Sequence, residues 1–281
     1  MNFYDLFSMY FYGVIDGFLT MRASAIAYNF FMALFPFLLF MLSLIAFIPV
    51  PGFQEQFMEI IFDSLPPKTH ELFQNIIYDL ATNKRESLLS IGLILSVIFF
   101  TNGVNAILTG FESSVNKIQD KRNFYKQYGY ALFISITLIL ILILTISAAI
   151  YFEVFVLYNL KKHGVIDDIS AWIIWSKRLF YFLIILFSTS ILYYFGTPEG
   201  KKLPFFSPGS IISSVFFILG FYLYSLYILN FNKYNQLYGS IGALLILQLM
   251  IYVYAIILLL GHELNMSIIR LQNGLKTTKL F

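Results

Sequence analysis

The chain has 281 residues, of which 59% are hydrophobic and only 12% are charged, and its net charge is +3. A soluble domain carries about 25% charged residues, and a soluble protein of this length could not bury so much apolar surface. The composition therefore predicts an integral membrane protein, and the small, scattered positive charge excludes a nucleic-acid-binding surface.

The first residues predict an amphipathic helix at the membrane surface, leading into the first span. No Lys or Arg precedes Arg22, whereas Asp5 and Asp16 are present, so the positive region of a cleaved signal peptide is missing. The apolar residues recur at helical spacing, at Phe3, Leu6, Phe7, Tyr10, Phe11 and Val14. Such a stripe is typical of a helix that lies in the interface.

Six stretches without Asp, Glu, Lys or Arg are each long enough to cross a bilayer as a helix, which takes about 20 residues. They predict an all-α membrane protein with six transmembrane helices, in a single domain over residues 1–281. The expected spans cover about 25–50, 88–109, 130–152, 179–195, 209–230 and 240–261.

Two features interrupt this pattern near its start. Pro36 lies inside the first span and predicts a kink or hinge near Met32–Pro36, because proline removes a backbone hydrogen bond. Residues 51–86 form the longest polar excursion, and short apolar stripes on either side of Pro66-Pro67 predict an extramembrane helical hairpin between spans one and two.

The basic residues predict the orientation. With six spans both termini share a side, and that side holds ten Lys and Arg residues against eight on the other. The positive-inside rule then places both termini in the cytoplasm. Four basic residues after the second span form a predicted cytoplasmic patch, which fixes the topology, contacts anionic lipid headgroups, or does both. These residues are Lys117, Lys121, Arg122 and Lys126.

Four stretches of the sequence carry motifs that occur together, in this order, in one protein family. They are "ASAIAYNFFMALFPFLLF", "VNKI" followed by "KRNFYK", "LYYFGTPEGKKLPFFSPGSII", and "NQLYGSIGALLILQLMIYVYAIILLLGHELN". Over almost its whole length the chain resembles the YihY/BrkB family of bacterial inner-membrane proteins, once labelled ribonuclease BN. The resemblance implies six spans with both ends in the cytoplasm. His262 departs from it, since alanine is common there.

Glu263 is the first candidate functional residue, because a long charge-free segment ends on it. One interpretation is a solvated carboxylate at the end of the last helix, near Asn265 and Arg270. The other is a carboxylate that faces a cavity on a transport pathway, since ionisable groups at membrane depth line pathways or pair internally. His262 would point about 100° away from it on a helix.

A second candidate cluster consists of polar residues within the first two spans. Tyr28 and Asn29 lie near the start of span one, and Asn102 and Asn105 near the end of span two. They are expected to form hydrogen bonds between helices. The alternative is a polar lining for a substrate path that is gated at Pro36.

The chemistry of an enzyme is missing from the sequence. A metal-dependent ribonuclease needs clustered Asp, Glu or His ligands, whereas His70, His163 and His262 are isolated, and the absence of cysteine excludes thiolate metal sites. No Walker-type phosphate loop is present. We therefore expect a non-enzymatic protein without a cofactor.

The expected function is to transport or handle a lipid or a small solute across the envelope. The alternative is a scaffold that docks another envelope protein and transports nothing. The expected partners are membrane lipids, with an envelope protein or further copies of the chain as additional candidates, and no nucleic acid.

Overall fold

The computed structural model describes residues 3–48, 78–79, 82–116, 118, 122–152, 171–230 and 240–274. Most of these residues are helical and none of them forms a strand, which confirms the predicted fold class. The elements are α1 (Phe3–Ile15), α2 (Leu19–Ile45), α5 (Glu86–Glu112), α6 (Phe124–Tyr151), α8 (Ala171–Gly196), the short 3₁₀ helix η2 (Pro198–Lys202), α9 (Pro208–Asn230) and α11 (Ser240–Gln272). The predicted hairpin over 51–86 lies outside the described residues except at its last positions.

Six of these helices are long and apolar enough to cross a membrane, as the charge-free windows predict. Several boundaries differ from the prediction: α8 begins at Ala171 rather than near 179, and α6 at Phe124 rather than near 130. Two further differences involve buried charges. The first membrane helix begins at Leu19 and includes Arg22, and the last continues through Glu263 to Gln272. The prediction stopped at charged residues, whereas the helices continue through them because the two charges are buried against each other.

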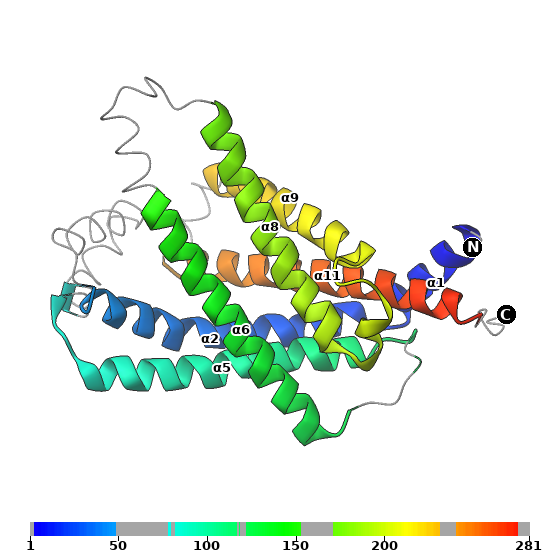
Figure 1. The fold of residues 1–281 in the computed structure, drawn as a ribbon, viewed down its shortest axis with the longest axis horizontal. Coiled ribbons are helices and arrows are strands. Elements are labelled where there is room, and N and C mark those ends of the chain that lie inside the picture. Colours follow the sequence, from blue (N-terminus) through cyan, green and yellow to red (C-terminus); the bar gives the residue numbers. More distant parts are fainter. Residues whose placement is uncertain are drawn as a thin grey trace.

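The six long helices form a ring in which each one packs against the next. The order around the ring is α2, α5, α6, α8, α9 and α11, and α11 contacts α2 again (Figure 1). The pairing of α2 with α5 depends on small residues. Ala23 and Ala27 are buried on α2. Gly92 of α5 lies so close to α2 that a Cβ added to Gly92 would be 3.1 Å from the backbone of Phe40. Small residues allow this close approach between membrane helices.

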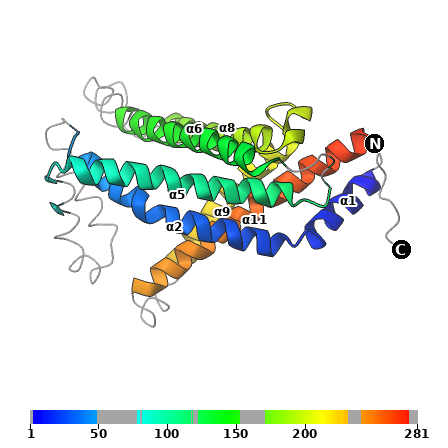
Figure 2. The ribbon, with the colours of Figure 1, turned by 90° about the horizontal axis from the view of Figure 1, so that it is seen from below.

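The amphipathic helix α1 lies outside the ring and packs against α11 near the end of the bundle that holds both termini (Figure 2). Phe18 joins it to α2 in the left-handed conformation, with φ 47°, which costs about 1–2 kcal/mol for a residue with a Cβ. This joint turns α1 so that Met9 is fully buried, while Phe7 and Phe11 remain exposed. The exposed aromatic side chains agree with a helix in the interface.

The ring is tightly packed at the end near the termini and spreads apart at the other end (Figure 2). The main core cluster, which includes Ile107, Phe111, Ile134 and Leu259, lies in the packed half. Towards the other end, none of the described residues of α8 before Thr189, or of α9 after Ser214, has a buried side chain. We refer to these two halves as the packed end and the splayed end.

Candidate functional site

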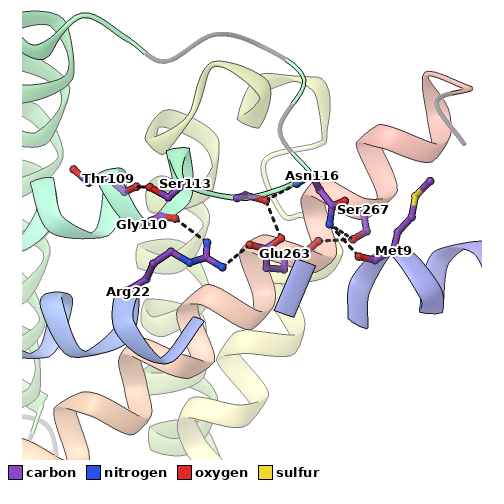
Figure 3. Close-up of polar contacts among 9 residues, drawn as sticks. Met9, Arg22, Thr109, Gly110, Ser113, Asn116, Glu263 and Ser267 are labelled. Atoms are coloured by element: carbon purple, nitrogen blue, oxygen red, sulfur yellow. Dashed lines mark hydrogen bonds and ion pairs between the residues drawn. The ribbon is translucent and has the colours of Figure 1, made fainter. Parts of the chain in front are cut away.

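A buried ion pair lies at the packed end of the bundle. Arg22 of α2 donates a hydrogen bond from Nη2 to Oε1 of Glu263 on α11, at 2.9 Å (Figure 3). The Glu263 side chain is fully buried, and that of Arg22 is only 8% exposed. Because a buried charge is costly unless it is paired and hydrogen-bonded, each of these residues requires the other.

The remaining polar atoms of the pair are bonded by two further segments. Arg22 donates from Nη1 to the carbonyl oxygen of Gly110 near the end of α5, at 2.9 Å. Ser114, directly after α5, donates to Oε2 of Glu263 at 2.8 Å. Both carboxylate oxygens therefore have partners, which is the arrangement that buried ions need. Among the described contacts, only Nε of Arg22 has no partner.

Asn116 extends the network to α1. Its Nδ2 donates to the carbonyl oxygen of Met9 at 3.0 Å (Figure 3). Its Oδ1 accepts from Arg270 at 3.1 Å. Gly13 of α1 lies directly on this cluster, since a Cβ there would be 2.5 Å from Asn116 Nδ2 and 2.6 Å from Glu263 Oε2. The network thus ties α1, α2, the segment after α5 and α11 together, and we name it the clamp: Arg22, Ser114, Asn116 and Glu263.

Tyr10 of α1 lies near the clamp and responds to it electrostatically. Burial, with a smaller contribution from the negative charge of Glu263, raises the pKa of Tyr10 above its ordinary value. A phenol is protonated at neutral pH in any case, and this shift acts in the same direction, so Tyr10 adds no negative charge beside the carboxylate.

The interpretation of Glu263 as a solvated carboxylate at a helix end is wrong. Its side chain is fully buried, and α11 continues to Gln272. The sequence analysis left two interpretations of Glu263 open, and the solvated one rested on its position at the end of a long apolar run. It could not identify Arg22, 241 positions away, as the partner.

The polar residues of the first two spans do not form one cluster. Tyr28 is 60% exposed, and Asn29 donates to the carbonyl oxygen of Ala25 within its own helix. In contrast, Asn102 accepts a hydrogen bond from Tyr128 at 3.0 Å, and Asn105 accepts one from Gln127 at 3.1 Å. These two residues link α5 to α6.

Pro36 lies within α2, which the structure assigns as one helix from Leu19 to Ile45. Proline has no backbone N–H, so the carbonyl oxygen of Met32 lacks its usual helical donor. This leaves a weak point in the helix at the predicted position, and a hinge there remains a prediction.

The predicted basic patch divides in the structure. Lys117 and Lys121 lie outside the described residues, and Lys126 is exposed. Arg122 bonds within the protein: its Nη1 donates to the carbonyl oxygens of Phe195 and Gly196, both at 3.0 Å, and its guanidinium lies 4.1 Å from the ring centre of Tyr130. It bonds the last carbonyls of α8, as basic residues do at helix C-termini. A headgroup contact of Arg122 stays a prediction.

Removing the Arg122 side chain should destabilise the protein, because the end of α8 would lose two charge-assisted hydrogen bonds. We expect Arg122→Ala to cost about 1–3 kcal/mol, whereas Lys126→Ala, on an exposed side chain at the start of α6, should cost less than about 0.5 kcal/mol. Unfolding of both purified variants in the same detergent would measure this. Equal stability of the two variants would show that Arg122 acts only as a surface charge.

A second polar cluster, which the sequence analysis missed, lies between α8, α9 and α11. The Tyr193 hydroxyl is 2.7 Å from the Ser213 Oγ and donates to the carbonyl oxygen of Leu258 at 2.9 Å. Asn265 accepts from the backbone N–H of Gly209 and donates to Ser207, both at 2.8 Å. The signal in the sequence was "SPGSIISS", whose small polar residues recur on one helical face.

The described residues offer no site for a metal ion, since nowhere among them do three His, Cys, Asp or Glu side chains gather closely enough to hold one. The acidic residues that are buried bond to backbone or to basic groups: Glu199 accepts from the backbone N–H of Ile118, and Glu112 from that of Arg122. The polar chemistry of the described part of the chain therefore holds segments together.

Comparison with known proteins agrees with this architecture. The model of the family described as virulence factor BrkB matches residues 14–279. The chain is 27% identical to the ribonuclease-like protein YfkH of Bacillus subtilis, over 87% of this chain and 88% of that protein. It is 25% identical to a UPF0761 membrane protein of Coxiella burnetii, over 85% and 84% of the two chains, and 23% identical to one of Haemophilus influenzae, over 88% of each. No solved structure matches the chain. The chain, with its six apolar helices, is therefore a membrane protein that belongs to the virulence factor BrkB family.

Proposed function

We propose that the protein handles a lipid, or a small solute with apolar parts, across the bacterial inner membrane and that it is not an enzyme. The observation that carries this proposal is the asymmetry of the helical ring. One end is closed by the clamp, and at the other end the helices are separated and lined by apolar side chains.

The exposure of consecutive residues indicates that the helices are separated at the splayed end. Residues 178–181 of α8 are all exposed, and successive helical residues point about 100° apart. Four in a row therefore cover the whole circumference of the helix. On α9 the consecutive residues Phe221, Tyr222 and Leu223 are 64%, 60% and 55% exposed.

Because every direction around α8 is represented, no neighbouring helix among the described residues covers this stretch of α8. Leu179, Phe180 and Tyr181 are large and mostly apolar, so the surface they offer suits acyl chains better than water. A closed polar cavity would instead favour a solute without apolar parts. The splayed end therefore supports lipid handling.

The orientation is part of the proposal. The packed end contains the start of α2, the loops that join α5 to α6 and α8 to α9, and the end of α11 (Figure 1). Of the ten Lys and Arg residues counted on the side of the termini, six are described and lie in or next to these regions: Arg22, Arg122, Lys126, Lys201, Lys202 and Arg270. By the positive-inside rule we place the packed end in the cytoplasm and the splayed end towards the outer side.

The packed end itself favours the second candidate function, a scaffold that docks another envelope protein. Its helices approach so closely that a Cβ on Gly209 would collide with the backbone oxygen of Gly261. A bundle that never opens there could present a fixed surface but could not release a substrate to the cytoplasm.

A flux measurement on purified protein distinguishes the two functions. The protein is reconstituted into vesicles that contain short-chain fluorescent phosphatidylglycerol or phosphatidylethanolamine, and the exposure of the fluorophore to a quencher outside is followed. We expect the fluorescent lipid to cross the bilayer faster than in two controls. One control is vesicles without protein, and the other is vesicles that contain an unrelated six-helix membrane protein. Rates equal to both controls, for lipid and for a trapped small solute, would refute transport and favour the scaffold.

A further inference from the structure

A small pocket lies between the end of α8, the turn that contains η2, and α11. It has room for about one water molecule. Its lining includes Tyr193, Thr197, Leu203, Ser207, His262 and Asn265. The pocket and the clamp share no residue, since none of the four clamp residues lines the pocket.

His262 is the unusual member of this lining. Its side chain is 4% exposed, and its ring packs edge-on against Phe111 at 4.2 Å between the ring centres. Its Nε2 is buried and has no hydrogen-bond partner among the described residues. A buried polar atom without a partner destabilises a fold, so this nitrogen points to a group that the chain itself does not supply.

Several polar groups of the pocket already have partners within the protein. Tyr193 is bonded to Ser213 and to the carbonyl oxygen of Leu258, and Asn265 is bonded to Gly209 and Ser207. His262 Nε2 is the fully buried side-chain atom of the lining that has no partner among the described residues.

The character of the lining limits the chemistry of that ligand. Apart from the histidine, no lining residue has an ionisable acidic or basic group other than the tyrosine phenols. An anion or a cation would enter without a counter-charge, which is unfavourable in a buried site. Leu203, Pro204 and Phe205 provide apolar contacts beside the polar atoms. An uncharged hydrogen-bonding group attached to an apolar body fits both properties.

We propose that this pocket binds the hydroxyl group of an uncharged amphipathic molecule, with His262 as its hydrogen-bonding partner and the apolar part of the molecule against Leu203, Pro204 and Phe205. The inference builds on the proposed handling of lipid or solute, for which it names a ligand chemistry. Binding and flux are measured separately, so the failure of one is distinguishable from the failure of the other.

The test compares two matched probes on the full-length protein in nanodiscs. Dioctanoylglycerol has one free hydroxyl, and its acetylated counterpart has none. We expect the first to bind about five- to tenfold more tightly, the effect of one hydrogen bond, and to shift the ¹⁵N resonance of the His262 side chain. Free glycerol is titrated in parallel. A shift with glycerol alone would show that the pocket takes a soluble polyol, and it would overturn the proposal of an amphipathic ligand.

Three variants control the assignment. His262→Phe keeps a ring against Phe111 and should abolish the preference for the free hydroxyl, whereas His262→Gln should restore part of it. Tyr125→Phe removes a hydroxyl from a tyrosine elsewhere that is 83% exposed, and should leave binding unchanged. If His262→Phe does not fold, the resonance shift in the unmodified protein still decides the matter. Equal binding of the two probes, or a His262 resonance that neither they nor glycerol move, would overturn the proposal.

Discussion

Replacing Glu263 by alanine should lower the free energy of unfolding by about 3–5 kcal/mol, the usual cost of removing one partner of a buried ion pair. The substitution leaves the Arg22 guanidinium, whose side chain is only 8% exposed, without its counter-charge. It also leaves the Ser114 hydroxyl without its acceptor. Denaturation by SDS, followed by circular dichroism of the purified protein in mixed micelles, would measure the change.

The chain contains a matched control for this experiment. Asp79 and Arg85 form an ion pair of similar length, 2.7 Å, with side chains that are 40% and 49% exposed. Breaking it with Asp79→Ala should cost at most about 1 kcal/mol, because water solvates both groups. The double variant Arg22→Met, Glu263→Leu should be more stable than Glu263→Ala, because no unpaired charge remains. If Glu263→Ala and Asp79→Ala had the same effect, the clamp would not hold the packed end together.

Alanine at Gly209 should be the second strongly destabilising substitution. Its Cβ would collide with the backbone oxygen of Gly261 on α11 and would lie 2.6 Å from the Asn265 Oδ1. A collision with backbone can only be relieved by moving α9 away from α11, which would stretch the hydrogen bond from the Gly209 N–H to Asn265. Overpacking of this kind costs about 1–3 kcal/mol, or more where the backbone cannot move.

The control is Gly129→Ala in α6. A Cβ added to Gly129 would have no atom within 4 Å apart from those of its chain neighbours and of the nearby backbone of α6. Alanine is favoured over glycine in a helix by about 1 kcal/mol, so this variant should be as stable as the parent or more so. The same SDS denaturation compares the two. A Gly209→Ala variant that matched Gly129→Ala would show that α9 and α11 are not in close contact.

The fold could be predicted from the sequence because lipid imposes a simple length rule on apolar helices. Every predicted span corresponds to an observed helix, yet the boundaries at Leu19 and Gln272 were missed. The charge-free windows stop at Arg22 in the first span and at Glu263 in the last. These two residues are each other's partner in the structure. Their pairing allows both charges to lie within apolar helices, and pairing is a tertiary property.

The candidate site was less predictable for the same reason. Glu263 could be singled out by its position after an apolar run, but its role depends on Arg22 and Ser114, which are distant in sequence. Arg122 was grouped with its basic neighbours by charge, whereas its partners are backbone carbonyls at the end of α8, which a sequence pattern does not reveal. His262 was noted only as a departure from the family pattern, and its unpartnered nitrogen could be seen only in the structure.

The most direct test of the proposed architecture is the sidedness of its two ends. The chain has no cysteine, so single cysteines can be placed at Asn83, before α5, and at Asn123, before α6, both of which are exposed. In intact cells a maleimide that cannot cross the inner membrane should label Asn83→Cys, and it should label Asn123→Cys only after lysis. Labelling of both positions from the same side would contradict a membrane-spanning α5 and, with it, the six-helix ring.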